Sequence, residues 1–293
     1  MTMKNYKFRI ISAPVCTGSP SSGSEFAYSR LISLGLADVF PDARFCSPGK
    51  LTIDLSCDSE SMRQLGMVTA VSKYVREMSL EAYEQGEIPI VIGGDHSIAM
   101  GSLAAAGEYH SPESLGLIYI DGHTDINTDK TSSTGFIHGM PLAAAMGLCG
   151  DALTIGKNKV NLYGENTHII GARSIDPPEY GIISENGVNL YEADKISFAD
   201  AANAAVDRLN GKKLHVSLDV DCMSKTEFSS TGYLMDGGMT LSQVIDTLKT
   251  VFSKGDVRSF ELVEYNPTLD PDNIDGKKLI ALLSEVRSLF LNK

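Results

Sequence analysis

The chain has 293 residues, of which 43% are apolar, so it can bury a substantial hydrophobic core and is not a disordered protein. Its 37 acidic and 25 basic residues give a formal net charge of −12, which argues against binding to nucleic acid or to an anionic membrane and favours a cationic small molecule. The five cysteines lack CxxC spacing, and no signal peptide or membrane span is evident. We therefore expect reduced thiols and a cytoplasmic protein.

Short apolar runs alternate with segments of helical periodicity along the whole chain. Strands are predicted at residues 7–13, 88–92, 115–120, 167–170, 187–191, 214–220 and 257–264, with a shorter one near 50–55. Helices are predicted at residues 60–85, capped by Ser59 or Ser61, and at 194–209, 240–253 and 276–291. This alternation predicts an α/β fold with a mostly parallel sheet covered on both faces. No repeat or linker divides residues 1–293, which are predicted to form a single domain.

Ligands of open α/β sheets bind at the carboxyl ends of the strands, so polar residues at those positions are the first candidates for a binding site. The Gly/Ser-rich residues 16–26 are predicted to form a loop after the first strand. The stretch GGDHSIA follows the apolar run IPIVI and delivers His96 to a strand end. By itself this pattern is also typical of a turn in which Asp95 caps a helix. We expect Asp95 to support the loop or a ligating histidine.

Two further stretches place charged groups at strand ends. In IYIDGHTDIN, the side chains of Asp121, His123 and Asp125 share one side if the chain stays extended. In LHVSLDVD, Asp219 and Asp221 share the face opposite the apolar positions. Each stretch alone is compatible with ordinary loop or capping residues, but the joint occurrence of three after strong strand patterns argues against coincidence.

Unpaired carboxylates are strongly unfavourable at low dielectric, so these groups require a positive partner. The sequence places no arginine beside these strand ends, whereas two imidazoles and four carboxylates suit a pair of divalent cations. Oxygen-rich ligation without cysteine favours manganese over structural zinc. The candidate ligands are His96, Asp121, His123, Asp125, Asp219 and Asp221. His110, His168 and His215 are interpreted as surface or core residues.

Together, GGDHS, DGHTD and SLDVD resemble the three metal-binding signatures of the ureohydrolase family, the arginase and agmatinase group, with Gly122 in place of the usual alanine. IISAPVCTGSPSSG resembles the family's opening strand and loop, and VEYNP resembles its late Val-Glu-x-Asn-Pro segment, so the resemblance covers nearly the whole chain. It implies a three-layer α/β/α fold with an eight-stranded sheet, two Mn²⁺ per subunit and a homo-oligomer, either trimer or hexamer.

The resemblance also implies roles for the ligands. His96, Asp121, Asp125 and Asp219 would bind one manganese ion, and Asp121, His123, Asp219 and Asp221 the other, so that Asp121 and Asp219 bridge. A water held between the ions would supply the hydroxide that attacks the guanidinium carbon.

Three further residues have catalytic roles by the same resemblance. Asp125 would orient the nucleophile, Glu264 would pair with the guanidinium, and His138 would carry a proton to the leaving amine. Without the resemblance, Glu264 would be interpreted as a surface acid after a strand and His138 as a loop histidine.

The arginase form of the family is the closest match in the loop at residues 125–139, which implies hydrolysis of L-arginine to L-ornithine and urea. Asn127 and Thr134 would bind the substrate's α-carboxylate, and Asp176 and Glu179 its α-amino group.

Three departures from the arginase pattern occur around this substrate end. Phe136 stands in place of an asparagine, Ser174 in place of an acid, and CMSKTEFSST follows Asp221 in place of an Asp-Pro loop. The alternatives are an agmatinase or another guanidino or formimino hydrolase, a one-metal deacetylase on a related fold, and a degenerate family member that acts as a binding protein.

Overall fold

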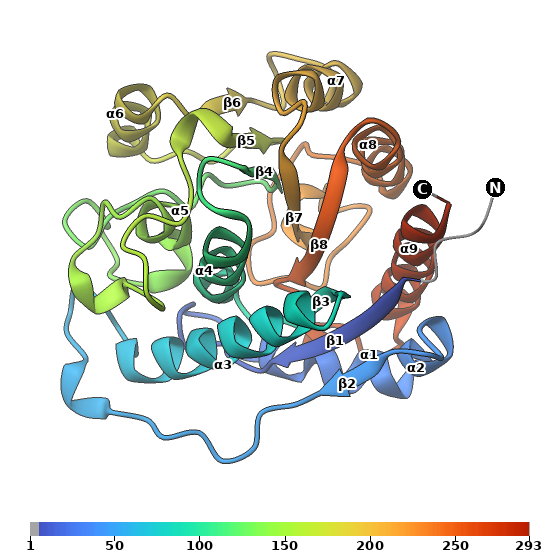
Figure 1. Cartoon of the computed structure of the whole chain (residues 1–293), viewed down its shortest axis with the longest axis horizontal. Helices are drawn as coiled ribbons and strands as arrows, with labels where there is room; N and C mark the ends of the chain where they lie inside the picture. The colour runs from blue at the N-terminus through green and yellow to red at the C-terminus, as the bar shows by residue number, and fades with distance from the viewer. Residues whose placement is uncertain (1–5, 293) are drawn as a thin grey trace.

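The computed structural model describes residues 6–292, which are built around one sheet of eight strands (Figure 1). The strands are β1 (Lys7–Ala13), β2 (Arg44–Cys46), β3 (Glu87–Gly93), β4 (Leu115–Ile120), β5 (Thr167–Ile170), β6 (Asn189–Tyr191), β7 (Lys213–Asp219) and β8 (Asp256–Val263). Every neighbouring pair is parallel, in the order β2-β1-β3-β8-β7-β4-β5-β6. The predicted α/β class and eight-stranded parallel sheet are confirmed.

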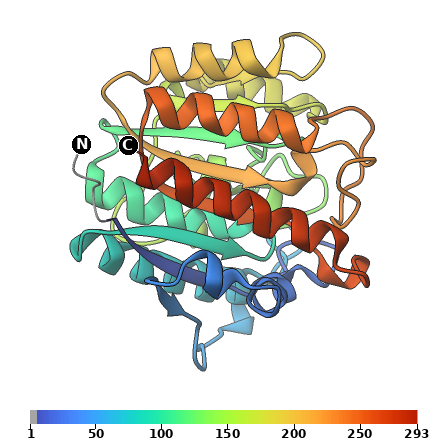
Figure 2. The same cartoon turned by 90° about the vertical axis from the view of Figure 1, so that its right-hand side faces the viewer.

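Helices cover both faces of the sheet, because strands such as β4 are apolar on both sides and are buried along their whole length. One face carries α3 (Leu65–Glu84), α4 (Ala99–His110), α5 (Pro141–Ala145) and α6 (Pro177–Asn186). The other carries α1 (Ala27–Ser33), α2 (Leu36–Val39), α7 (Phe198–Arg208), α8 (Leu241–Lys254) and α9 (Ile274–Leu291). Figure 2 shows α7, α8 and α9 side by side on this second face. None of the helices in residues 6–292 is long and apolar enough to span a membrane.

Two local predictions are wrong. The strand expected near residues 50–55 is not formed, since Asp54 accepts a hydrogen bond from the Ser56 backbone and starts a 3-10 turn instead. The edge strand beside β1 is instead β2, whose three residues are too few to show an alternating pattern. The helix expected from residue 60 begins at Leu65, and neither predicted serine caps it. The five cysteines have free thiols, as expected.

The order of the strands explains why the three sequence stretches meet. β3, β8, β7 and β4 are consecutive in the sheet and parallel, so the segments that follow them emerge at the same edge. The site therefore lies above the four central strands.

The two glycines of GGDHS allow the chain after β3 to lie against the end of β1. The amide of Gly94 donates to the Ala13 carbonyl at 3.1 Å, and the amide of Asp95 donates to the Val15 carbonyl at 2.8 Å. Asp95 accepts from the amides of Ser97 and Gly18, so it both caps the following turn and supports the loop after β1. The expected support of the loop by Asp95 is observed, and the alternative interpretation as a cap applies to the same residue.

A Cβ atom at Gly94 would lie 1.8 Å from the Val15 carbonyl oxygen, which belongs to the backbone and cannot rotate away. We expect Gly94→Ala to lower the free energy of unfolding of the metal-free protein by about 3 kcal/mol, measured by urea denaturation. The exposed Gly49, whose Cβ would meet nothing within 4 Å, provides the control: Gly49→Ala should leave the stability unchanged or raise it by up to about 1 kcal/mol. Equal effects of the two substitutions would contradict this account.

Candidate metal centre

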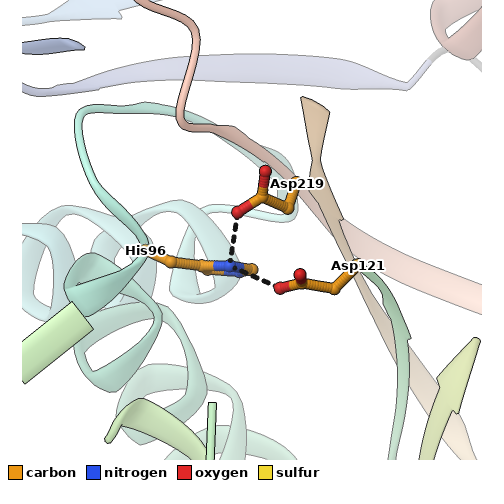
Figure 3. Close-up of side chains that lie close together, drawn as sticks. All are labelled: His96, Asp121 and Asp219. Atoms are coloured by element: carbon orange, nitrogen blue, oxygen red, sulfur yellow. Dashed lines mark hydrogen bonds and ion pairs between the residues drawn. The ribbon is translucent and has the colours of Figure 1, made fainter. Parts of the chain in front are cut away.

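His96 lies in the turn after β3 and points its Nδ1 atom at carboxylates from two other strand ends (Figure 3). Nδ1 is 3.0 Å from Asp121 Oδ2, 3.1 Å from Asp219 Oδ2 and 3.3 Å from Asp125 Oδ2. His96, Asp121 and Asp219 form a buried group whose ligand atoms could hold one metal ion.

A second group lies beside the first and shares one residue with it. His123 Nδ1 is 2.9 Å from Asp221 Oδ2 and 3.7 Å from Asp121 Oδ1. Asp121, His123 and Asp221 could hold a second ion, so Asp121 is placed to bridge the two. All six predicted ligands are thus brought together at one edge of the sheet, and the bridging role of Asp219 stays a prediction.

The chain reaches this arrangement differently from what strand alternation predicts. β4 ends at Ile120, the amide of His123 folds back to donate to Asp121 Oδ1 at 2.6 Å, and Asp125 has a positive φ of 45°. The expectation that the chain stays extended from Asp121 to Asp125 is therefore wrong. After β7, the amide of Asp221 likewise donates to Asp219 Oδ1 at 2.7 Å.

The chemistry of these groups fits divalent cations. Asp121 Oδ2 is fully buried and accepts no well-formed hydrogen bond, although His96 Nδ1 is near, which leaves a lone pair directed at the shared space. The ligand atoms of both groups are carboxylate oxygens and imidazole nitrogens. Arg173 does approach the segment after β7, but its guanidinium donates to the carbonyl oxygens of Asp221, Cys222 and Met223 rather than to a carboxylate.

Protons and cations compete for these ligands. Burial alone would lower the pKa of His96, but the adjacent carboxylates of Asp121, Asp125 and Asp219 outweigh burial and hold the pKa well above its usual value. Burial likewise would lower the pKa of His123, but the carboxylates of Asp221 and Asp121 together outweigh burial and raise the pKa well above its usual value. In the metal-free protein both imidazoles are therefore protonated over a wide pH range.

Groups that the sequence analysis did not single out surround His96. The Tyr119 ring stacks on the imidazole at a centroid distance of 4.4 Å, and its hydroxyl donates to Asp125 Oδ2 at 2.8 Å. His96 Nε2 is 2.7 Å from Ser217 Oγ and 4.0 Å from Glu261 Oε1, contacts that fix which nitrogen faces the carboxylates. Glu261 could have been found from the sequence, because an acidic residue inside a buried strand such as β8 is unusual.

The remaining histidines lie outside both groups of ligands. His168 and His215 are buried and hydrogen-bond to Tyr191 and Ser259, respectively, and His110 ends α4.

Glu264 and His138 lie next to the cluster. Glu264 follows β8 with a positive φ of 66°, and its Oε1 accepts from the His96 amide at 2.9 Å. His138 Nδ1 is 3.7 Å from the same oxygen. Burial would lower the pKa of His138, but Glu264 outweighs this effect and raises it.

A cavity of about 360 Å³ opens above these groups. Its lining is Pro20, His123, Asp125, Asn127, Ser132, Thr134, Phe136, His138, Gly139, Ser174, Asp176, Glu179 and Tyr233, so it contains all four predicted substrate-binding residues. Asp176 and Glu179 form a capping box at the start of α6. Both Glu179 oxygens accept from backbone amides, those of Ile126 and Asp176, and the Asn127 amide group donates to Asp176 Oδ2 at 3.0 Å.

Fold and site together define a metal-dependent enzyme of the α/β class. Residues 6–286 match the profile of the Arginase family, and the chain belongs to that family. It is 33% identical to the arginase of Brevibacillus brevis over 96% of this chain and 98% of that one, and 33% identical to the arginase of Bacillus subtilis over 78% of each. The solved structure of arginase from Bacillus caldovelox matches with a TM-score of 0.87 and 29% identity over 99% of both chains. The predicted resemblance and the class of hydrolase acting on amidino groups are thereby confirmed.

The raised pKa values of His96 and His123 make cation binding dependent on pH, because each imidazole must lose its proton before it can ligate. We expect the affinity of the metal-free protein for Mn²⁺ to rise at least about tenfold from pH 6 to pH 8, with release of protons, by titration calorimetry in buffers of different ionisation heat. Burial lowers the pKa of His110 to about 4, so His110→Ala should leave this dependence unchanged. If the affinity for Mn²⁺ were the same from pH 6 to pH 8, protons and cations would not compete for these histidines.

Proposed function

We propose that the protein binds two manganese ions and hydrolyses L-arginine to L-ornithine and urea. The observation that carries this proposal is a pair of ligand groups sharing Asp121 at the base of an acid-lined cavity, with Glu264 and His138 beside them. Four carboxylates match the charge of two divalent ions. Family membership supports the reaction type.

When bound, the metal pair supplies a water whose pKa is lowered to near neutrality. Asp125 would hold the metal and would also accept a hydrogen bond from this water, since the Tyr119 hydroxyl fixes the orientation of its carboxylate. The left-handed backbone at Asp125 turns its side chain back toward His96.

Glu264 and His138 act on the substrate itself. The Glu264 carboxylate holds the planar guanidinium by charge-assisted hydrogen bonds. His138, whose pKa is raised by Glu264, holds a proton near neutral pH and gives it to the departing amine. The charge on Glu264 also stabilises the imidazolium during this transfer.

At the other end of the cavity, we propose that Asp176 and Glu179 attract the substrate's α-amino group and that Asn127 and Thr134 meet its α-carboxylate. The position of all four in the cavity lining supports these roles. Both oxygens of Glu179 already accept hydrogen bonds from backbone amides, so Glu179 fixes the rim and supplies negative charge. Asp176 is the residue that contacts the α-amino group directly.

Three wider features belong to the same proposal. We propose a single domain over residues 1–293, assembly as a homo-oligomer, trimer or hexamer, and a cytoplasmic location. The continuous eight-stranded sheet supports the first and the five free thiols support the last.

A second candidate is hydrolysis of agmatine or another guanidino compound without an α-carboxylate. Phe136 lines the cavity where a polar partner for the carboxylate was expected, and the described lining residues include no lysine or arginine. A dication would therefore be well accommodated.

Urea release decides between these functions. The protein is loaded with Mn²⁺, its metal is counted, and urea is measured with L-arginine, agmatine and a series of guanidino acids. We expect about two ions per chain and the highest kcat/KM for L-arginine. A higher value for agmatine would favour the second candidate, and urea from none of the compounds would refute both.

Glu264→Gln removes the charge that pairs with the guanidinium and keeps an oxygen for the His96 amide. We expect kcat/KM for L-arginine to fall by about 100-fold or more while the melting temperature is kept. The matched control is Glu77→Gln on the exposed side of α3, which should leave kcat/KM unchanged. A Glu264→Gln variant with normal kcat/KM would show that this carboxylate does not bind the reacting group.

A further inference from the structure

Tyr233 lies between β7 and α8, two residues after the stretch CMSKTEFSST that departs from the arginase pattern, and the mechanism above does not use it. It lines the cavity beside His138 and is the one tyrosine among the lining residues that the structure describes. Its ring is half-buried, and burial raises the pKa of its hydroxyl to about 12, so the phenol stays protonated at neutral pH.

The phenol contacts the imidazole of His138 in two ways. The rings stack at a centroid distance of 5.1 Å with an interplanar angle of 25°, and the Tyr233 hydroxyl is 3.2 Å from His138 Nε2. The other imidazole nitrogen, Nδ1, faces Glu264 at 3.7 Å. His138 is therefore held at one face and at both nitrogens.

The neighbours of Tyr233 keep this contact in place. Its ring meets that of His123 edge-on at 5.5 Å, and Ser19, from the loop after β1, lies close enough to its hydroxyl to influence the pKa. The backbone of His138 is already fixed, since its amide donates to the Gly18 carbonyl at 3.0 Å. The freedom that remains to His138 is rotation of its side chain, which is the motion that the phenol restricts.

We propose that Tyr233 is a positioning residue that holds the His138 imidazole in the orientation needed for proton transfer to the leaving amine. The proposal rests on the arginine hydrolysis proposed above. A phenol suits the role because its hydroxyl donates to a neutral Nε2 and accepts from a protonated one, so one contact survives both states of the histidine. The π-face of the stacked ring also favours the imidazolium form.

The test is a double-mutant cycle on the manganese-loaded protein. Tyr233→Phe keeps the stacking and removes the hydroxyl, so we expect kcat for L-arginine to fall about tenfold while KM changes less than about twofold. In the His138→Ala background, Tyr233→Phe should cause no further loss, because its effect passes through the imidazole. Tyr163→Phe, which removes another hydrogen-bonded hydroxyl far from the cavity, should leave kcat unchanged.

Several outcomes overturn the proposal. An additional loss of kcat in the double variant, or a raised KM with normal kcat, would mean that the phenol contacts the substrate directly. A fall in melting temperature that matches the loss of activity would mean a merely structural role.

A crystal structure of the manganese-loaded Tyr233→Phe protein tests the same proposal without any turnover. We expect the His138 ring to turn away from Glu264 or to occupy two orientations, whereas the wild-type ring has one. An unchanged ring overturns the positioning role. If the wild-type protein released no urea, the proposed function would fail while this structural comparison still decided whether Tyr233 orients His138.

Discussion

Negative charge buried at the carboxyl edge of four adjacent strands is the constraint on which the rest of the structure depends. Asp121, Asp219 and Asp221 are at most 2% exposed, and the buried Glu261 and Glu264 lie beside them with at most 3% exposure. Removing one charge from water is already expensive, and like charges at short range add to the penalty. Protons on the imidazoles relieve part of it, as the raised pKa values of His96 and His123 show, but divalent cations relieve more without protonating the carboxylates. Metal binding and stability of the fold are therefore two aspects of one equilibrium.

The backbone around this charge is strained where the chain leaves the sheet. Asp125 and Glu264 both adopt left-handed φ values, a conformation that costs of order 1–2 kcal/mol for residues other than glycine. The strain persists because neighbouring loops lock each residue: the Asp125 carbonyl accepts from the Leu142 amide at 3.1 Å, and the Glu264 amide donates to the Gly94 carbonyl at 2.8 Å. Both side chains are thereby returned toward the space above the central strands. The carboxylates of Asp125 and Glu264 are thus positioned by hydrogen bonds between segments that leave the same edge of the sheet.

The sequence predicted the sheet and the ligands because both leave local signals. A strand buried on both faces is a continuous apolar run, as in β4, and the polar residues that interrupt such runs at their ends are few. Helix α4 could not be predicted in this way. Its own residues are mostly small or apolar on every side, so it has no polar face that would reveal a helical periodicity. The contact of Tyr233 with His138 joins residues 95 apart through two irregular loops, and no periodicity specifies such a pair. The course of the chain from Asp121 to Asp125 could not be predicted either, because hydrogen bonds within the turn replace the extended strand geometry there.

The charge of the cavity also limits how it can distinguish substrates. Among the residues that the structure describes, its lining includes the carboxylates of Asp125, Asp176 and Glu179 and no lysine or arginine, so both positive ends of an arginine molecule meet negative charge there. The α-carboxylate of the substrate therefore has no lysine or arginine partner in that described lining. Asn127 already donates to Asp176, and the guanidinium of the exposed Arg63 lies 4.9 Å from the centre of the Phe136 ring. In the proposed function, recognition of the carboxylate therefore depends on neutral hydroxyl and amide groups and on a screened surface charge, whereas recognition of the guanidinium depends on buried charges that solvent screens less. Under the same proposal, the buried contacts at the reacting end of the substrate contribute most of the binding, and selectivity for the amino-acid end depends on the neutral groups of the rim.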